Sequence, residues 1–449
     1  MKDDTIRKVA LDIGNNRIKL LVGEISSDFQ KIAVTKYVNV ESRGIQKSVI
    51  ENSEQLAEAI GEAIRKAESL EDPITKVSIA LGGSKIFSST VNVKLSFPER
   101  EIEEADIDNL LKQAKKEVFS GKAGEYRILY KEVYNKKLDR PGIVKQPIGM
   151  ISKELQADVH FIYVEEDYVQ KITQIINKIG VDVGRVYLNS YASAKGTLDE
   201  EAWKKGVVFV DIGYGSTSVI ILKYGKVLYA KTISLGKMHY ISDLTYKFKI
   251  STEEAERIVQ KLINKEFEAD NTIRCGTKKI LLRDIRDVIS ARTEDIIEFI
   301  KSTIEIANFD ESYQKGIILT GGTVEIEGIF ERIASRFNYL VRKMEPIPLK
   351  GLSNPSYSDA VVVGIFLEDM EKEYQNHRRM EKEKEKTSEL ESEKNLKEIP
   401  SDDRNVDKKN NIKTGMKEEI DVFLEEIKEI EDEEVGKLEK ILKWVKELF

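Results

Sequence analysis

The sequence is poor in the residues that build disulfides, histidine metal centres and membrane spans. Its one cysteine, Cys275, excludes an internal disulfide and fits a reducing compartment such as the cytosol. The three histidines, at positions 160, 239 and 377, are scattered, which favours structural roles over metal ligation. No apolar run reaches the length of a membrane span, and Met1–Asp4 contains no apolar segment. We therefore expect neither a transmembrane helix nor a signal peptide.

An excess of positive charge is also missing. The chain has 449 residues and a formal net charge of −7. This acidic balance argues against nucleic acid as the principal partner. The length exceeds what one hydrophobic core usually serves, so we expect two or more domains.

Two apolar strands that each run into an acidic, glycine-bearing turn are the main feature present. The first strand holds Asp12 and the second Asp211, and the turn residues that follow them are Gly14, Asn15 and Asn16, and Gly213, Tyr214, Gly215, Ser216 and Thr217. Glycine and small polar residues allow tight turns whose N–H groups hold phosphate oxygens. A carboxylate beside a polyphosphate is expected where Mg²⁺ bridges them through water, which assigns that role to Asp12 and Asp211. Two such turns predict two lobes around one nucleotide.

Each turn leads into a second strand, at residues 17–24 and 219–222, and so forms a hairpin. The P-loop and the dinucleotide-binding fingerprint both lead into a helix instead, so neither is present. A third strand, 316–320, is followed by Gly321, Gly322 and Thr323 and then by a predicted helix at 326–337. A glycine pair near a helix N-terminus can bring the backbone against a nucleotide.

Taken singly, each turn is more often a plain hairpin turn. The three turns in this order resemble those of the actin, sugar kinase and heat-shock-protein superfamily of ATP-binding proteins. The resemblance implies that ATP and Mg²⁺ bind between the lobes.

A predicted insert narrows the resemblance. After strand 75–81 and Gly82-Gly83, the pattern predicts strands near 91–95, 127–134 and 158–164 and a helix at 103–119. An insert at this point resembles the FtsA family of bacterial cell-division proteins and their pilus-assembly relatives. The resemblance covers nearly all of residues 5–370, with further matching motifs at 42–45, 200–206, 234–239, 251–257 and 319–322.

The resemblance implies an α/β fold of the two-lobed, actin-like type. Lobe 1 is expected at 1–84, 165–205 and 340–370, with the insert at 85–164, and lobe 2 at 206–240 and 312–339, with a further subdomain at 241–311. It adds Lys19, Glu253 and Glu256 to the nucleotide contacts. Tyr214 and Thr323 stand where the family usually has glycine. Segment 188–196 between the lobes has no carboxylate or imidazole, so we expect slow hydrolysis at most.

The tail divides into two parts. Residues 371–433 are dense in charge and are expected to form a disordered linker, with helix at most transient. Residues 434–449 predict an amphipathic helix that lies on a membrane of anionic lipids. Its apolar face holds Val435, Leu438, Ile441, Leu442, Val445, Leu448 and Phe449, with Trp444 at the edge. Lys437 and Lys446 flank this face, and Lys440 and Lys443 lie opposite it. The alternative is a helix docked on its own domain.

The resemblance implies a protein that polymerises on the cytoplasmic face of the cell membrane at the division septum. There it anchors the tubulin-like protein FtsZ and helps to recruit later division proteins. The C-terminal peptide of FtsZ is expected on 241–311, with Arg292, Glu294 and Glu298 as the best-matching surface, although a solvated charged helix is the alternative for each residue. The rival functions are a pilus-assembly adaptor and a sugar kinase or exopolyphosphatase. The terminal helix disfavours the adaptor, and the missing carboxylate disfavours the enzymes.

Overall fold

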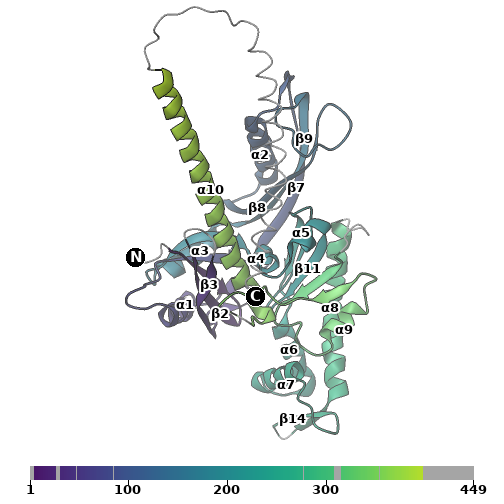
Figure 1. Cartoon of the computed structure of the whole chain (residues 1–449). Helices are drawn as coiled ribbons and strands as arrows, with labels where there is room; N and C mark the ends of the chain where they lie inside the picture. The colour runs from purple at the N-terminus through teal and green to yellow at the C-terminus, as the bar shows by residue number, and fades with distance from the viewer. Residues whose placement is uncertain are drawn as a thin grey trace, which may run out of the picture. The chain divides into compact units, whose positions relative to one another are not determined.

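The computed structural model describes residues 5–397 except 27–30, 47, 84, 277, 308–314 and 353, and only the backbone of 381–397. The chain divides into two units, Met1–Asp369 and Met370–Phe449. The first unit holds both lobes and the insert (Figure 1).

Lobe 1 is built on a sheet of five described strands in the order β10-β6-β1-β2-β3. Three antiparallel neighbours come first in the chain: β1 (Thr5–Ile13), β2 (Arg17–Ser26) and β3 (Ile32–Glu41). Strands β6 (Lys76–Leu81) and β10 (Asp182–Leu188) add in parallel. Helices α1 (Ser53–Ala67) and α3 (Glu166–Asn177) pack on this sheet, and two short strands, β4 (Ile45–Gln46) and β5 (Val49–Ile50), pair beside it.

The helices of lobe 1 follow from the sequence pattern. Asn52 caps the N-terminus of helix α1, and its side chain accepts hydrogen bonds from the N–H groups of Glu54 and Gln55. Its apolar residues recur at helical spacing and are fully buried, as at Leu56 and Ile60. The core of lobe 1 forms between this face and the buried strands.

Lobe 2 repeats this arrangement in the order β13-β12-β11-β16-β17. Its strands are β11 (Val207–Ile212), β12 (Thr217–Lys223), β13 (Lys226–Ile233), β16 (Ile317–Thr320) and β17 (Val341–Lys343). A helical subdomain follows β13 and holds α6 (Lys237–Phe248), α7 (Thr252–Asn264), α8 (Leu282–Ile306) and the hairpin β14 (Thr272–Cys275) and β15 (Lys278–Leu281). Cys275 is buried in this hairpin. The predicted helix 326–337 is shorter in the structure, where α9 spans Ile329–Ala334.

The insert is a sheet of three described strands in the order β7-β9-β8 with one helix along it (Figure 1). Its elements are β7 (Ile86–Glu101), α2 (Glu104–Phe119), β8 (Tyr126–Lys137) and β9 (Ile151–Glu165). The strands are longer than predicted. His160 is 1% exposed between the hydroxyl groups of Ser88 and Thr90, which confirms a structural role.

Short helices connect the lobes, and a long one ends the described part. Helices α4 (Asn189–Lys195) and α5 (Glu200–Lys205) lead from lobe 1 into lobe 2, and the 3₁₀ turn η1 (Tyr357–Asp359) runs into α10 (Ala360–Lys397). Helix therefore extends through residues 371–397, farther than the predicted linker boundary at 371 allows. The predicted linker beyond 397 and the terminal helix 434–449 lie outside the described residues.

Candidate nucleotide site

The two acidic turns have the same backbone hydrogen bond. The N–H of Gly14 donates to the carbonyl of Arg17 at 3.0 Å, and the N–H of Gly213 donates to that of Ser216 at 2.9 Å. A Cβ on Gly14 would lie 2.6 Å from the Arg17 oxygen, so the turn requires glycine. Both glycine amides are used inside the turn. Ligand contacts from these turns therefore fall to the N–H groups of the residues between.

Asn15 brings the turns of the two lobes together. A Cβ on Gly215 would lie 2.7 Å from Asn15 Nδ2, so the lobe 2 turn can come this close to Asn15 only because residue 215 is glycine. Asn15 Oδ1 also accepts a hydrogen bond from the N–H of Ser48 at 2.7 Å. Asn16 is exposed at the tip of its turn. The facing arrangement expected of the two turns is thus present.

A pocket lies where these turns meet. Both turns line it, through Gly14, Asn15 and Ser216, and so do Ser48, Gly82 and Asn189. Gly82 directly follows β6, just as a glycine follows β1, β11 and β16, and this repetition is visible in the sequence. Asn189 begins α4, so the interlobe segment supplies an amide here.

Asp12, which is buried, and Asp211, which is partly buried, are the carboxylates that precede the two turns. Burial raises the pKa of Asp12 to about 6, opposed by Lys19 and reinforced by the charge of Asp211. Burial also raises the pKa of Asp211, against the hydrogen bond from Ser193 Oγ at 2.6 Å. The raised pKa values mean that burial disfavours the ionised carboxylates more than Lys19 favours them, and a divalent cation would supply further positive charge. These residues therefore fit Mg²⁺. Within the described residues, no group of three or more acidic, histidine or cysteine side chains could hold a metal ion.

The third glycine turn packs onto the second. Gly321 has φ of +89°, and a Cβ there would lie 2.3 Å from Asp211 Oδ1. Thr323 donates its N–H to the carbonyl of Ile212 at 3.1 Å and its hydroxyl to that of Gly213 at 2.7 Å. The hydroxyl of Thr217 likewise donates to the carbonyl of Leu235 at 2.7 Å. Both threonines therefore use their hydroxyls to hold the backbone of the site.

Lys19 lies opposite Asp12 in the β1–β2 pair and is 3% exposed. Its ammonium nitrogen is 3.1 Å from Asp359 Oδ1 and 2.7 Å from Ser358 Oγ. Sequence reasoning misses both partners because more than 300 residues separate them from Lys19 and no local pattern marks them. Only the return of the chain to lobe 1 brings them there.

Lys237 and Glu325 are two further residues that the sequence does not single out as contacts. An added Cβ on Gly322 would lie 4.0 Å from Lys237 Nζ and 3.9 Å from Glu325 Oε2. Burial lowers the pKa of Lys237 and raises that of Glu325, and each charge opposes the shift of the other. Lys237 belongs to the family-like motif 234–239, and this motif is the only feature of the sequence that points to Lys237.

Glu253 and Glu256, two of the expected nucleotide contacts, are exposed on α7. Ser251 and Glu254 form the capping box that starts this helix, with bonds of 3.2 and 3.0 Å. Tyr214 Oη donates to Glu256 Oε1 at 3.4 Å. Tyrosine in place of the usual glycine therefore connects the second turn to α7.

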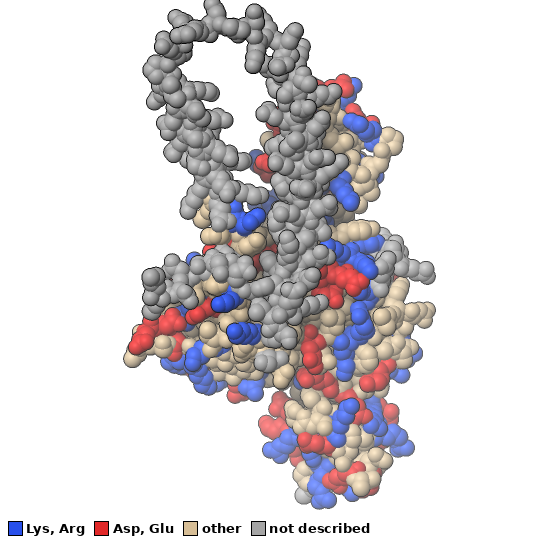
Figure 2. All heavy atoms as spheres, viewed as in Figure 1, with Lys and Arg blue, Asp and Glu red and all other residues tan. Residues whose placement is uncertain are grey.

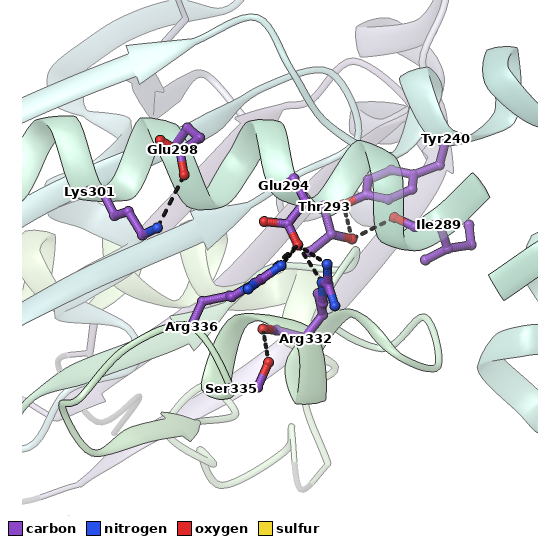
Figure 3. Close-up of polar contacts among 9 residues, drawn as sticks. All are labelled: Tyr240, Ile289, Thr293, Glu294, Glu298, Lys301, Arg332, Ser335 and Arg336. Atoms are coloured by element: carbon purple, nitrogen blue, oxygen red, sulfur yellow. Dashed lines mark hydrogen bonds and ion pairs between the residues drawn. The ribbon is translucent and has the colours of Figure 1, made fainter. Parts of the chain in front are cut away.

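The predicted partner surface is a row of ion pairs on α8. Arg292 donates to both oxygens of Asp243 at 2.7 and 2.9 Å. Glu294 accepts from Arg332 and Arg336, and Figure 3 shows it between these two arginines. Glu298 pairs with Lys301 at 3.1 Å and is 68% exposed. Of the three, Arg292 and Glu294 join α8 to its neighbours, and Glu298 is the most accessible.

The predicted membrane residues of 434–449 lie outside the described residues. In the part of the chain that is described, no helix has the length and apolar character needed to span a membrane. Acidic and basic side chains are mixed on the face of the described residues that Figure 2 shows.

Comparisons with known proteins place the chain near one family. A family model described as "Cell division protein FtsA" matches residues 208–362, and one described as "SHS2 domain inserted in FTSA" matches residues 83–163. Cell division protein FtsA of Pseudomonas aeruginosa is 27% identical over 379 residues, which is 81% of this chain and 89% of that protein. The protein of the same name from Borreliella burgdorferi is 26% identical over 381 residues, again 81% of this chain and 91% of its own length.

A solved structure with the same fold is titled "PilM-PilN type IV pilus biogenesis complex". Its TM-score is 0.58 at 13% identity, and the match covers 81% of this chain and 99% of that one. At this identity the likeness shows the fold alone. With the two lobes and the insert, it confirms the expected two-lobed, actin-like architecture.

Proposed function

The chain belongs to the FtsA family of cell division proteins, and from that membership we propose that it is an actin-like ATP-binding protein that anchors FtsZ to the membrane. Its place is the cytoplasmic face of the cell membrane at the septum. There it polymerises with copies of itself and helps to recruit later division proteins. The matches to the insert and to lobe 2 support this role over that of a pilus-assembly adaptor.

One observation supports nucleotide binding above all others. The turns of both lobes meet at Asn15 and Gly215, and each turn follows an aspartate, Asp12 being buried and Asp211 partly buried. Backbone N–H groups from two sides suit phosphate oxygens, and the carboxylates suit a hydrated Mg²⁺. This geometry supports ATP and Mg²⁺ as the ligands.

Hydrolysis in this site is slow. The interlobe side chain at the pocket is Asn189, an amide that can orient water but cannot take up its proton. We expect phosphate release well below the usual enzyme range of about 1 s⁻¹. A phosphate-release assay with Mg²⁺-ATP measures it, and a rate of about 1 s⁻¹ or faster would refute the expectation.

Glu298 is the contact on α8 that a peptide of FtsZ reaches most easily. Its carboxylate is 68% exposed and shares one surface ion pair with Lys301 (Figure 3). Arg292 and Glu294 already hold neighbouring elements, so a peptide that used them would have to exchange existing ion pairs.

The tail supplies the membrane contact. One short amphipathic helix inserts only partly and binds weakly, and a filament presents many such helices at high effective concentration. Attachment therefore depends on anionic lipid, on protein concentration and on assembly supported by ATP. The residues that contact the membrane are those of the predicted apolar face of 434–449 and the lysines of the same helix.

Liposome pelleting tests the proposal. Wild-type protein should pellet with anionic liposomes and carry purified FtsZ with it, whereas Trp444→Glu protein or protein lacking 434–449 should polymerise with ATP and stay in the supernatant. Lys409→Glu, in the predicted linker, is the matched control and should pellet. Wild-type pelleting of the Trp444→Glu protein would show that this tail is not the membrane contact.

A further inference from the structure

Lys19 is fully engaged by the segment that begins α10. Its ammonium nitrogen is 3.1 Å from Asp359 Oδ1 and 2.7 Å from Ser358 Oγ, and it also donates to the Ser358 carbonyl. An ammonium group has three N–H donors. These three oxygens occupy all of them, so a phosphate oxygen that binds Lys19 must displace at least one.

Asp359 is held in place from two sides. Tyr37 Oη, on β3, donates to its Oδ1 at 2.6 Å, and the N–H of Ser356 donates to its Oδ2 at 2.8 Å. Asp359 is the last residue of η1, and α10 begins at the next residue. The position of Lys19 is therefore coupled directly to the first turn of α10.

The same turns of α10 also press against α4. A Cβ on Gly364 would lie 1.6 Å from the carbonyl oxygen of Ala192, and one on Gly196 would lie 2.2 Å from that of Ala360. Helix α4 also carries Ser193, which donates to Asp211 at 2.6 Å. The base of α10 is thus linked to Asp12 through Lys19 and to Asp211 through α4.

We propose that Lys19, Ser358 and Asp359 form a nucleotide-sensitive latch on the base of α10. The phosphate oxygens of a bound nucleotide take Lys19 from Ser358 and Asp359, and the junction between η1 and α10 loosens. This inference rests on the proposed nucleotide site. Because α10 leads into the tail, the latch gives the nucleotide a route to the tail that does not depend on assembly.

A different role for Asp359 makes the opposite prediction. If Asp359 merely positioned Lys19 for phosphate, its removal would weaken nucleotide binding. In the latch, Asp359 competes with phosphate for the ammonium group, so its removal strengthens binding. Ser358→Ala removes one uncharged competitor and should change affinity in the same direction, by less.

Calorimetry on the full-length protein separates the two roles. With Mg²⁺ and a non-hydrolysable ATP analogue, Asp359→Asn should bind roughly fivefold more tightly than wild type. Asp369→Asn is the matched control. Asp369 is also buried on α10, but it pairs with Arg185 and Tyr187 and is not in contact with Lys19. Affinity in this control should stay within about twofold of wild type, and weaker binding by Asp359→Asn would overturn the latch.

Hydrogen exchange supplies a test that requires no variant. When nucleotide binds to wild type, amides 356–366 should exchange several-fold faster, although the turns themselves become protected. In Asp359→Asn they should exchange fast with and without nucleotide. If nucleotide binds and this segment keeps or gains protection, the latch is wrong and the nucleotide site stands. If calorimetry detects no binding to wild type, both proposals fail.

Discussion

The hairpins β1–β2 and β11–β12 have one backbone design but differ in the side chain that is paired with the strand position of the acid. Their turns share the same hydrogen bond, and their sheets share the same strand order. The residue paired with the acid differs. Lys19 pairs with Asp12 in lobe 1, and Ser218 pairs with Asp211 in lobe 2. Asp12 thus has a buried cation on its partner strand, whereas Asp211 has a hydroxyl group there, although the charge of Lys19 acts to lower the pKa of both acids.

This difference between Lys19 and Ser218 shows that the same hairpin geometry can place either a charged or an uncharged side chain beside the aspartate. Ser218 shares a hydrogen bond of 2.9 Å with Thr232 on β13, so it serves the sheet. Asp211 takes its hydrogen bond from Ser193 on α4 instead. In lobe 1 the side chain that stabilises the acid, Lys19, therefore belongs to the same hairpin as Asp12. In lobe 2 the hydrogen bond to Asp211 comes from Ser193, on the helix α4 between the lobes.

Exchange of the paired residues should have the largest effect. Lys19→Met leaves Asp12 and Asp359 buried without their cation and should lower the free energy of unfolding by about 3–5 kcal/mol. Ser218→Ala, at the matched position, should cost only about 1 kcal/mol because it loses one neutral hydrogen bond. Urea unfolding followed by circular dichroism measures both. Similar losses in the two variants would contradict the electrostatic difference.

The pH dependence should reveal the buried acid of lobe 1. The pKa of Asp12 is about 6 in the folded protein against a usual 3.8. Protonated Asp12 therefore stabilises the fold below pH 3.8, and this stabilisation is lost as the pH rises through about 6. Asp12→Asn cannot ionise, so its unfolding free energy relative to wild type should rise by up to about 3 kcal/mol from pH 4 to pH 7. A difference that stays constant with pH would show that Asp12 is not perturbed.

Removal of either acid should have the smallest of these effects, on nucleotide affinity. Asp12→Ala or Asp211→Ala should weaken Mg²⁺-ATP binding by roughly 1–3 kcal/mol because a charge-assisted contact is lost. Isothermal calorimetry gives the value. Asp72→Ala, which removes a surface partner of Arg7, is the control and should bind as wild type does. Wild-type affinity in both site variants would remove these aspartates from the Mg²⁺ site.

The strands and the glycine turns could be predicted because they depend on local signals. β-Branched runs mark buried strands, and glycine after each run marks a tight turn. Helix boundaries were harder to predict. Gly328 precedes α9 with a φ of +92°, which delays its start, and the many Glu and Lys residues after 370 favour helix as much as they favour disorder.

The sequence by itself determined the two hairpins with Asp12 and Asp211, the insert and the family to which they belong. Tertiary structure alone decided which side chains meet: Asn15 with Gly215 across the lobes, and Lys19 with Ser358 and Asp359 at the base of α10. The physical reason is the distance along the chain over which each kind of interaction acts. Strand, turn and helix preferences act over a few residues, whereas a buried ammonium group must find its oxygen atoms wherever the folded chain brings them.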